Sequence, residues 1–371
     1  MNAKRVFILG AGFSKQAGMP LATELTNCLL QKHREDNLQE MIEWYNFLKQ
    51  RISWLEKASG EKSVAINIEQ VFDLARFDVE LWKMRQHLCP VGRQWGDTPS
   101  NSADSIETWL SDLQDDLIDV IWEKQEQAKQ KLKLISRFSQ NLQQDDVVLT
   151  FNYDTLLENS LTDQKKAWCY GFEREKGNGI SILKMHGSIN WAIVLRNQYK
   201  NFGYTLLFRK EDKNINENNA KPSGEREYDY VLLHIPDNSL KNRIENRILQ
   251  KGCKQYSIGI AGLGSYKPLH MLHGSGEVWF NAIKALREAE EICVVGFSLS
   301  PFDNMSRLHF GGVMCERAEK GNLPKKVVLI DPSADKPEFK RNFHSVFGGS
   351  TPIQFYSEKA EKVDWAQLLG Y

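Results

Sequence analysis

Five short apolar runs in this sequence each end in small or polar residues that could bind a ligand or move a proton. The motifs are Gly10-Ala11-Gly12-Phe13-Ser14, Thr150-Phe151-Asn152-Tyr153-Asp154, His186-Gly187, Gly296-Phe297-Ser298 and Ile330-Asp331. Glycines let a backbone approach a phosphate closely, and the start of a following helix favours an anion. An imidazole such as that of His186 can take up a proton at neutral pH. Together the motifs indicate a site for a phosphate-containing ligand with a base nearby.

The glycine turn is the strongest of these motifs, although it departs from the usual dinucleotide fingerprint. Gly10 and Gly12 match the first two glycines of G-x-G-x-x-G, but Lys15 occupies the third glycine position. The turn is therefore not that of an ordinary dehydrogenase. A glycine corner that merely joins a strand to a helix is the alternative interpretation.

The apolar runs alternate with helical periodicity, which indicates the fold class. Strands are predicted at residues 6–9, 147–149, 180–185, 292–296, 327–330 and 353–356, with a helix at the C-terminus. Strands separated by helices predict a doubly wound, mostly parallel, Rossmann-like α/β sheet covered on both faces. The polar motifs all follow strands, where ligands bind in open α/β sheets.

Residues 27–144 contain no convincing strand and are predicted to form a helical insertion. Met41, Ile42, Tyr45, Leu48, Ile52 and Leu55 recur at helical intervals, and similar spacing continues beyond them. The catalytic Rossmann-like domain is then predicted to comprise residues 1–26 and 145–371. Residues 212–227 are charged and predicted to be a mobile loop, whereas residues 228–235 are a candidate strand, with residues 204–208 as a candidate partner.

Composition narrows the class of protein further. The 371 residues include 48 basic and 48 acidic ones, so no net charge attracts nucleic acid or membrane. The six cysteines form no C-x-x-C pair, and His270 and His273 have no third ligand nearby, so no metal site is expected. Without a signal peptide or an apolar run of membrane-spanning length, a cytoplasmic protein with free thiols is expected.

The motifs together resemble those of the sirtuin-like family, and most closely the bacterial sirtuin-like NAD hydrolases of anti-phage defence. The resemblance rests on GAG-x-S, TFNYD, the K-x-HGSINW segment that ends at Trp191 and the G-F-S-L-x-x-x-D segment that ends at Asp303. It covers residues 1–26 and 145–335, interrupted by 192–275. Within the helical block only Ile68-Glu69-Gln70-Val71-Phe72 looks like a recurring pattern of these proteins.

Two departures distinguish this chain from the sirtuin deacetylases. The cysteine pairs that bind zinc in those enzymes are missing, and the insertion is large and helical, with nothing that indicates an acyl-lysine groove. The resemblance therefore implies NAD as a substrate, no zinc, and cleavage of NAD rather than protein deacetylation.

The resemblance also assigns a role to each motif. Gly10, Ala11, Gly12 and Ser14 would hold the pyrophosphate. Asn152 would bind the nicotinamide-side ribose or position water, and Asp154 would hold the nicotinamide amide or the turn itself. His186 would be the general base on a ribose hydroxyl or on water. Gly296 belongs to the late turn of the cofactor site, and Ser298 and Asp331 would contact the adenosine side.

Simpler interpretations of these residues remain. Asn152 and Asp154 could be turn or helix-capping residues, and His186 could be a structural histidine. Asp331 precedes Pro332, a common start of a helix or turn.

The motifs and the resemblance together predict an NAD hydrolase that releases nicotinamide and ADP-ribose. The resemblance alone implies that it acts as an NAD-depleting effector of anti-phage defence. The alternatives are a non-catalytic NAD or ADP-ribose sensor and an NAD-dependent protein-modifying transferase or deacylase. A homo-oligomer is expected, with a HerA-type ATPase or an Argonaute-like protein as a possible partner.

Overall fold

The computed structural model describes residues 5–59, 67–88, 103–171, 179–195, 230–234, 256–260, 264, 275–300, 303–348 and 351–369. Within them a seven-stranded sheet has the order β10-β9-β8-β1-β2-β4-β3, and all its neighbouring strands are parallel. The strands are β1 (Arg5–Leu9), β2 (Val147–Thr150), β3 (Trp168–Tyr170), β4 (Ile180–Lys184), β8 (Glu291–Val295), β9 (Lys326–Ile330) and β10 (Ile353–Tyr356). The predicted doubly wound parallel sheet is confirmed.

Residues 6–9 of β1 are all apolar, as expected for a strand whose sheet is covered by helices on both faces. Val6, Phe7, Ile8 and Leu9 are all at most 1% exposed, although alternate residues of a strand point to opposite faces. On one face Phe7 packs against Phe138 of α6 (Leu132–Ser139), which also contacts Trp365 of α12 (Trp365–Leu369). α7 (Leu156–Asp163) packs beside α6.

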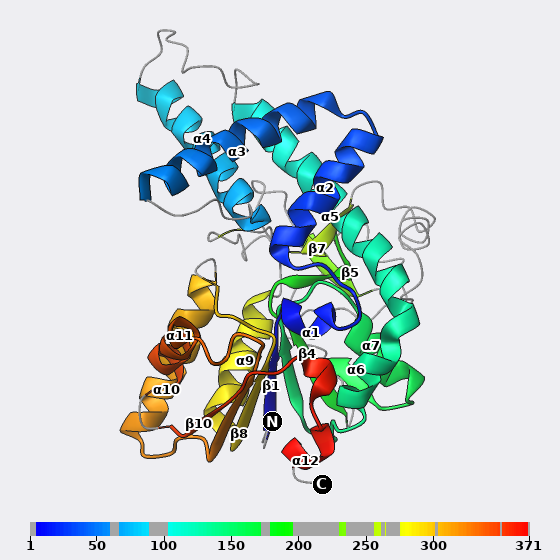
Figure 1. The fold of residues 1–371 in the computed structure, drawn as a ribbon, viewed down its shortest axis with the longest axis vertical. Coiled ribbons are helices and arrows are strands. Elements are labelled where there is room, and N and C mark those ends of the chain that lie inside the picture. Colours follow the sequence, from blue (N-terminus) through cyan, green and yellow to red (C-terminus); the bar gives the residue numbers. More distant parts are fainter. Residues whose placement is uncertain are drawn as a thin grey trace, which may run out of the picture.

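The other face is covered by α9 (Ser275–Glu288), α10 (Asn304–Glu319) and α11 (Pro337–Phe347), which pack side by side (Figure 1). The short helix α1 (Ala11–Lys15) follows β1 directly, and 3-10 turns lie at Lys129–Lys131 and Ala360–Lys362. α1 therefore begins earlier than the helical pattern at Thr23 indicates.

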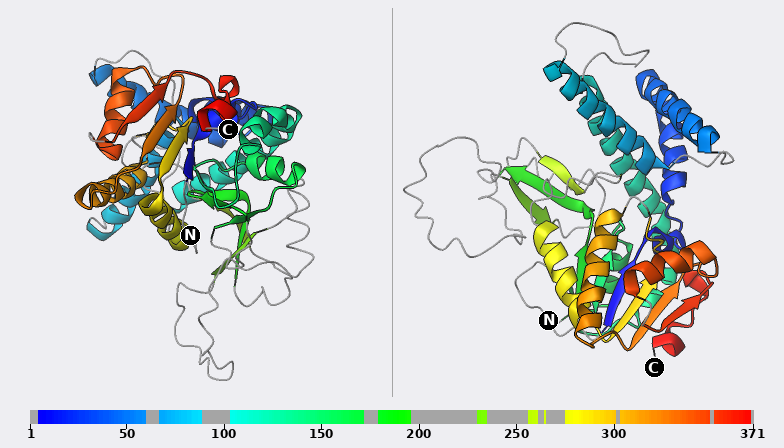
Figure 2. Two further views of the ribbon diagram at one scale, coloured as in Figure 1. Left: turned by 90° about the horizontal axis from the view of Figure 1, so that it is seen from below. Right: turned by 90° about the vertical axis from the view of Figure 1, so that its left-hand side faces the viewer.

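A separate group of helices projects beyond the carboxyl ends of the strands (Figures 1 and 2). It consists of α2 (Ala22–Glu35), α3 (Gln39–Ser59), α4 (Ile68–Leu88) and α5 (Ala103–Ala128), whose last turns contact the loop after β2. Trp44 and Trp109 pack against each other in its interior, with ring centroids 5.5 Å apart. α6 lies inside the predicted insertion of residues 27–144 but packs on the sheet, and the domain boundaries themselves stay a prediction.

A second, antiparallel sheet has the order β6-β5-β7. Its strands are β5 (Gly187–Leu195), β6 (Tyr230–His234) and β7 (Tyr256–Ile260). β6 lies within the predicted strand at residues 228–235 and pairs with β5. Residues 204–208 and the loop 212–227 lie outside the described residues. In the part of the chain that is described, no helix is both long enough and apolar enough to cross a bilayer.

Candidate functional site

The glycine turn lies at the point where the strand order reverses. β2 lies on one side of β1 and β8 on the other, so the loops after β1 and β8 meet at the carboxyl edge of the sheet. The Gly10 N–H donates to the Val295 carbonyl at 3.0 Å, and the Gly12 N–H donates to the Gly296 carbonyl at 2.9 Å. These bonds join the first and the fourth predicted motifs.

Glycine is required at this contact for steric reasons. A Cβ on Gly10 would lie 2.5 Å from the Gly296 carbonyl oxygen, and a Cβ on Gly12 would lie 2.7 Å from the Gly296 Cα. Gly296 has a φ of +59°, and a Cβ there would collide with the Phe13 amide. The two loops therefore approach each other as closely as only glycines allow.

The turn still offers donors to a ligand. Among the described residues nothing accepts a hydrogen bond from the Ala11 N–H, and Ala11 borders the cavity described below. The hydroxyl of Ser14 accepts a bond from Asn152, which leaves its O–H able to donate. The Ala11 amide and the Ser14 hydroxyl are thus the groups of this turn best suited to a phosphate.

Asn152 follows β2 and is held in one orientation. Its Nδ2 donates to the Gly10 carbonyl and to the Ser14 Oγ, both at 3.0 Å. Because a backbone carbonyl can only accept, the atom that faces Gly10 must be the nitrogen. The Oδ1 of Asn152 is left as an acceptor for a hydroxyl or a water molecule.

His186 follows β4 and lies among aromatic and acidic groups. Its Nε2 is 3.5 Å from the Asp303 Oδ1, and its ring meets the Phe151 ring edge to face at 4.9 Å between centroids. Phe151 in turn stacks on Phe297 at 4.3 Å. His186 is 6% exposed and Asp303 9% exposed. A carboxylate beside a buried imidazole stabilises the cation that forms when the ring takes up a proton.

Asp154 and Asp331 both hold turns with their carboxylates. The Asp154 Oδ1 accepts the Leu156 N–H at 3.1 Å, and the Asp331 Oδ1 accepts the Ser333 N–H at 2.7 Å. Both residues nevertheless border the cavity. Burial raises the pKa of Asp331, although the bond from Ser333 and the charge of Lys336 act in the opposite direction.

One cavity of about 670 Å³ connects all of these groups, within the range of about 300–1,000 Å³ that is typical of ligand sites. Every predicted site residue borders it: Gly10, Ala11, Gly12, Ser14, Asn152, Asp154, His186, Gly296, Ser298 and Asp331. The loops follow the sheet order, so Asp331 after β9 and His186 after β4 border the cavity from strands on opposite sides of β1. Its size and polar groups fit an elongated ligand such as a dinucleotide.

The helical group supplies part of the wall, which the sequence predictions did not include. Ile121 of α5, Glu69 of α4 and Asn67 just before α4 border the cavity. Glu69 is 8% exposed, and its N–H bonds to the Asn67 Oδ1 at 2.9 Å. Asp303 was also missed as a site residue. Both residues belong to patterns that this sequence shares with the sirtuin-like proteins, residues 68–72 and the segment that ends at Asp303, and these patterns could have identified them as site residues.

The described residues contain no group of three His, Cys, Asp or Glu side chains that could hold a metal ion. His270, His273, Cys89 and Cys253 lie outside them. The expected lack of zinc therefore stays a prediction.

A SIR2-like domain matches residues 146–244, less than half of the chain. This match supports a sirtuin-like family and an NAD-related activity. No curated protein matches in sequence. Two solved structures are similar. The first is a SIR2 complex with the inhibitor EX-527, 2′-O-acetyl-ADP-ribose and deacetylated p53 peptide. The second is described as the structural basis for sirtuin substrate affinity. Each is 12% identical in sequence to this chain, and the match covers 96% of this chain. It covers 89% of the first structure's chain and 88% of the second's, with TM-scores of 0.33 and 0.31.

Proposed function

We propose that this protein is an NAD glycohydrolase that cleaves NAD with water to nicotinamide and ADP-ribose. The observation that carries the proposal is the single cavity at the carboxyl edge of the sheet, which joins the glycine turn to Asn152 and His186. NAD lies in it as the substrate, with its pyrophosphate at Ala11 and Ser14. Its adenosine end points toward Ser298 and Asp331, and its nicotinamide end toward Asn152 and His186.

The chemistry asks little of the protein beyond binding, orientation and one proton acceptor. Bond cleavage at the nicotinamide-side ribose releases a neutral leaving group, and water adds to the same carbon. The Asn152 Oδ1 holds the ribose hydroxyl or that water, since its Nδ2 is already engaged with Gly10 and Ser14. His186 accepts the proton, and Asp303 at 3.5 Å stabilises the resulting imidazolium.

The purified full-length chain tests this directly by incubation with NAD and measurement of nicotinamide and ADP-ribose. Asn152→Ala and His186→Ala should each lower turnover by about 100-fold or more, because each removes a group that acts on the reacting atoms. Asn342→Ala and His344→Ala, on α11 and outside the cavity lining, serve as matched controls and should keep wild-type turnover.

Other outcomes identify the alternatives. Thermal stabilisation of all variants by NAD without turnover would contradict hydrolysis and indicate a sensor. Transfer of a label from NAD to a protein target, or removal of an acyl group from one, would indicate a protein-modifying enzyme instead.

The biological setting that we propose is NAD depletion in bacterial anti-phage defence, in the cytoplasm, as a homo-oligomer with a HerA-type ATPase or an Argonaute-like partner. Its support is the motif resemblance alone. Cellular NAD, measured in bacteria that express the chain with a candidate partner, should fall only after phage infection and only when His186 is intact. A constant NAD level in infected cells would contradict it.

A further inference from the structure

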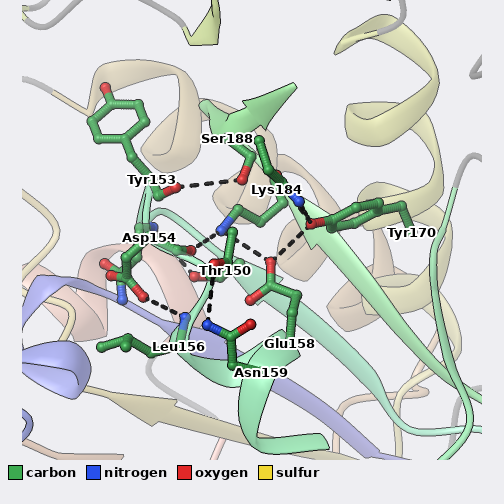
Figure 3. A network of polar contacts seen from close by, with 12 residues as sticks. Thr150, Tyr153, Asp154, Leu156, Glu158, Asn159, Tyr170, Lys184 and Ser188 are labelled. Atoms are coloured by element: carbon green, nitrogen blue, oxygen red, sulfur yellow. Dashed lines mark hydrogen bonds and ion pairs between the residues drawn. The ribbon is translucent and has the colours of Figure 1, made fainter. Parts of the chain in front are cut away.

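A lysine and a glutamate form a buried ion pair directly behind the candidate site. Lys184 is the last residue of β4, two positions before His186, and Glu158 lies in the first turn of α7. The Lys184 Nζ is 3.2 Å from the Glu158 Oε1, and both side chains are 1% exposed. The same ammonium donates a hydrogen bond to the Asp154 carbonyl (Figure 3).

Two further side chains complete the polar network around this pair. The Tyr170 hydroxyl donates to the Glu158 Oε1 at 3.1 Å, and the Asn190 Nδ2 donates to the Tyr170 oxygen at 3.0 Å. The glutamate therefore accepts bonds from β3 and from β4 at once, although it is almost fully removed from water.

The adjacent carbonyl of the same loop is held from the same side. Tyr153 O accepts the Ser188 hydroxyl at 3.3 Å and the Ile189 N–H at 3.1 Å. Residues 184–189 thus hold two consecutive carbonyls of the loop that carries Asn152. Because His186 lies in the middle of that segment, the contacts fix the spacing between the two proposed catalytic side chains.

Fold stability alone does not explain a lysine at this position. A buried ion pair gives little net stabilisation, and apolar residues of similar volume often replace one without loss. Methionine in place of Lys184 would retain the packing of β4 but would remove the donor to the Asp154 carbonyl. Unlike an apolar residue, the lysine has a long side chain whose charged end donates a hydrogen bond to the Asp154 carbonyl.

We propose that Lys184, compensated by Glu158, is a positioning residue that holds the loop 151–155 against the segment 184–189, so that Asn152 and His186 keep the spacing needed for reaction. The inference rests on the proposed hydrolase function. It adds to that function a buried charge that contacts neither substrate nor reacting atoms.

The test uses the double variant Lys184→Met/Glu158→Leu, because Lys184→Met alone would leave an uncompensated buried carboxylate, which is strongly destabilising. The control is Lys325→Met/Glu290→Leu, which removes an exposed pair of 2.6 Å at the amino-terminal edge of the sheet. Circular dichroism first establishes that both variants fold. NAD turnover then gives kcat and KM, and hydrogen exchange reports on residues 150–156.

The double variant should fold with kcat at least about tenfold below wild type and KM within about threefold, since misplacement of about 1 Å can cost far more. Amide exchange over residues 150–156 should be at least tenfold faster. A folded double variant with wild-type kcat would overturn the inference. If the wild-type protein has no NAD turnover, the proposed function fails by itself, and unchanged exchange would still overturn the positioning role.

Discussion

The side-chain nitrogen of Asn152 lies 3.0 Å from the hydroxyl of Ser14, although the two residues are 138 positions apart in the sequence. This bond joins the loop after β2 to the helix after β1, so that a proposed reacting group and a proposed phosphate ligand share one hydrogen bond. The orientation of Asn152 therefore depends on the glycine turn. A change on the phosphate side should affect catalysis as well as binding.

Ser14→Ala tests that dependence. The variant removes one of the two acceptors of the Asn152 Nδ2 and also the hydroxyl donor proposed for the pyrophosphate. We expect KM for NAD to rise and kcat to fall about tenfold, with a loss of stability of about 1 kcal/mol. Ser345→Ala, an exposed serine of α11, is the control. A rise in KM with unchanged kcat would contradict the link to Asn152.

Gly296→Ala should destabilise the protein because the residue combines a positive φ with contact to the glycine turn. The left-handed conformation alone costs a non-glycine residue about 1–2 kcal/mol, and collision with the Phe13 amide adds to it. The expected loss in free energy of unfolding is about 2 kcal/mol or more, measured by urea denaturation.

Gly312→Ala in α10 should instead raise the free energy of unfolding slightly. Nothing lies within 4 Å of the position of its Cβ, and alanine favours a helix interior by about 0.5–1 kcal/mol. If both substitutions changed the free energy of unfolding equally, the close contact of Gly296 with the glycine turn would not be the reason for a glycine there.

Much of this site was predictable because it depends on strand ends. In a parallel sheet, motifs that follow different strands must meet at one edge, so sequence order and apolar runs were enough to place Gly10, Asn152 and His186 together. Tertiary contacts were not predictable in the same way. A lysine in a strand is ordinarily taken as exposed, and nothing local shows that Lys184 would be buried against Glu158.

Of the second sheet, the sequence predicted the strand that contains β6 but not β5 or β7, for a related reason. β5 (Gly187–Leu195) begins at the second residue of the motif His186-Gly187, so part of the segment predicted to border the site is the start of a new strand. Gly187 has a φ of +83°, which lets the chain leave β4 and enter another sheet after a turn of only two residues, Met185 and His186. Local apolar patterns do not reveal such a change of partner.

Asp331→Asn should change the pH dependence of stability. Burial raises the pKa of Asp331, so the folded protein binds this proton more tightly than the unfolded chain. The associated stabilisation is present below the unfolded pKa, about 3.9, and is lost as pH rises through the raised folded pKa. Asparagine keeps an acceptor for the Ser333 N–H and has no charge to bury.

The variant should therefore equal or exceed wild type in stability at pH 7 while it binds NAD more weakly, because the proposed contact with the adenosine side of NAD loses its charge. Denaturant unfolding between pH 4 and 7 and NAD titration measure the two effects. Asp335→Asn, an exposed aspartate nearby, is the control. Weaker stability of Asp331→Asn at pH 7 with unchanged NAD affinity would contradict both parts.

Gln125→Met tests whether the helical group supports the site loop. Gln125 of α5 is fully buried, and its Oε1 accepts the Thr155 N–H at 2.6 Å and the Thr155 hydroxyl at 3.2 Å. Methionine fills a similar volume but leaves the Thr155 amide without this acceptor, which should cost about 1–3 kcal/mol in the free energy of unfolding. Because Thr155 adjoins Asp154, NAD turnover should fall as well. Gln31→Met, on the exposed face of α2, should change neither quantity. Loss of stability with full turnover would mean that α5 supports the fold without acting on the loop.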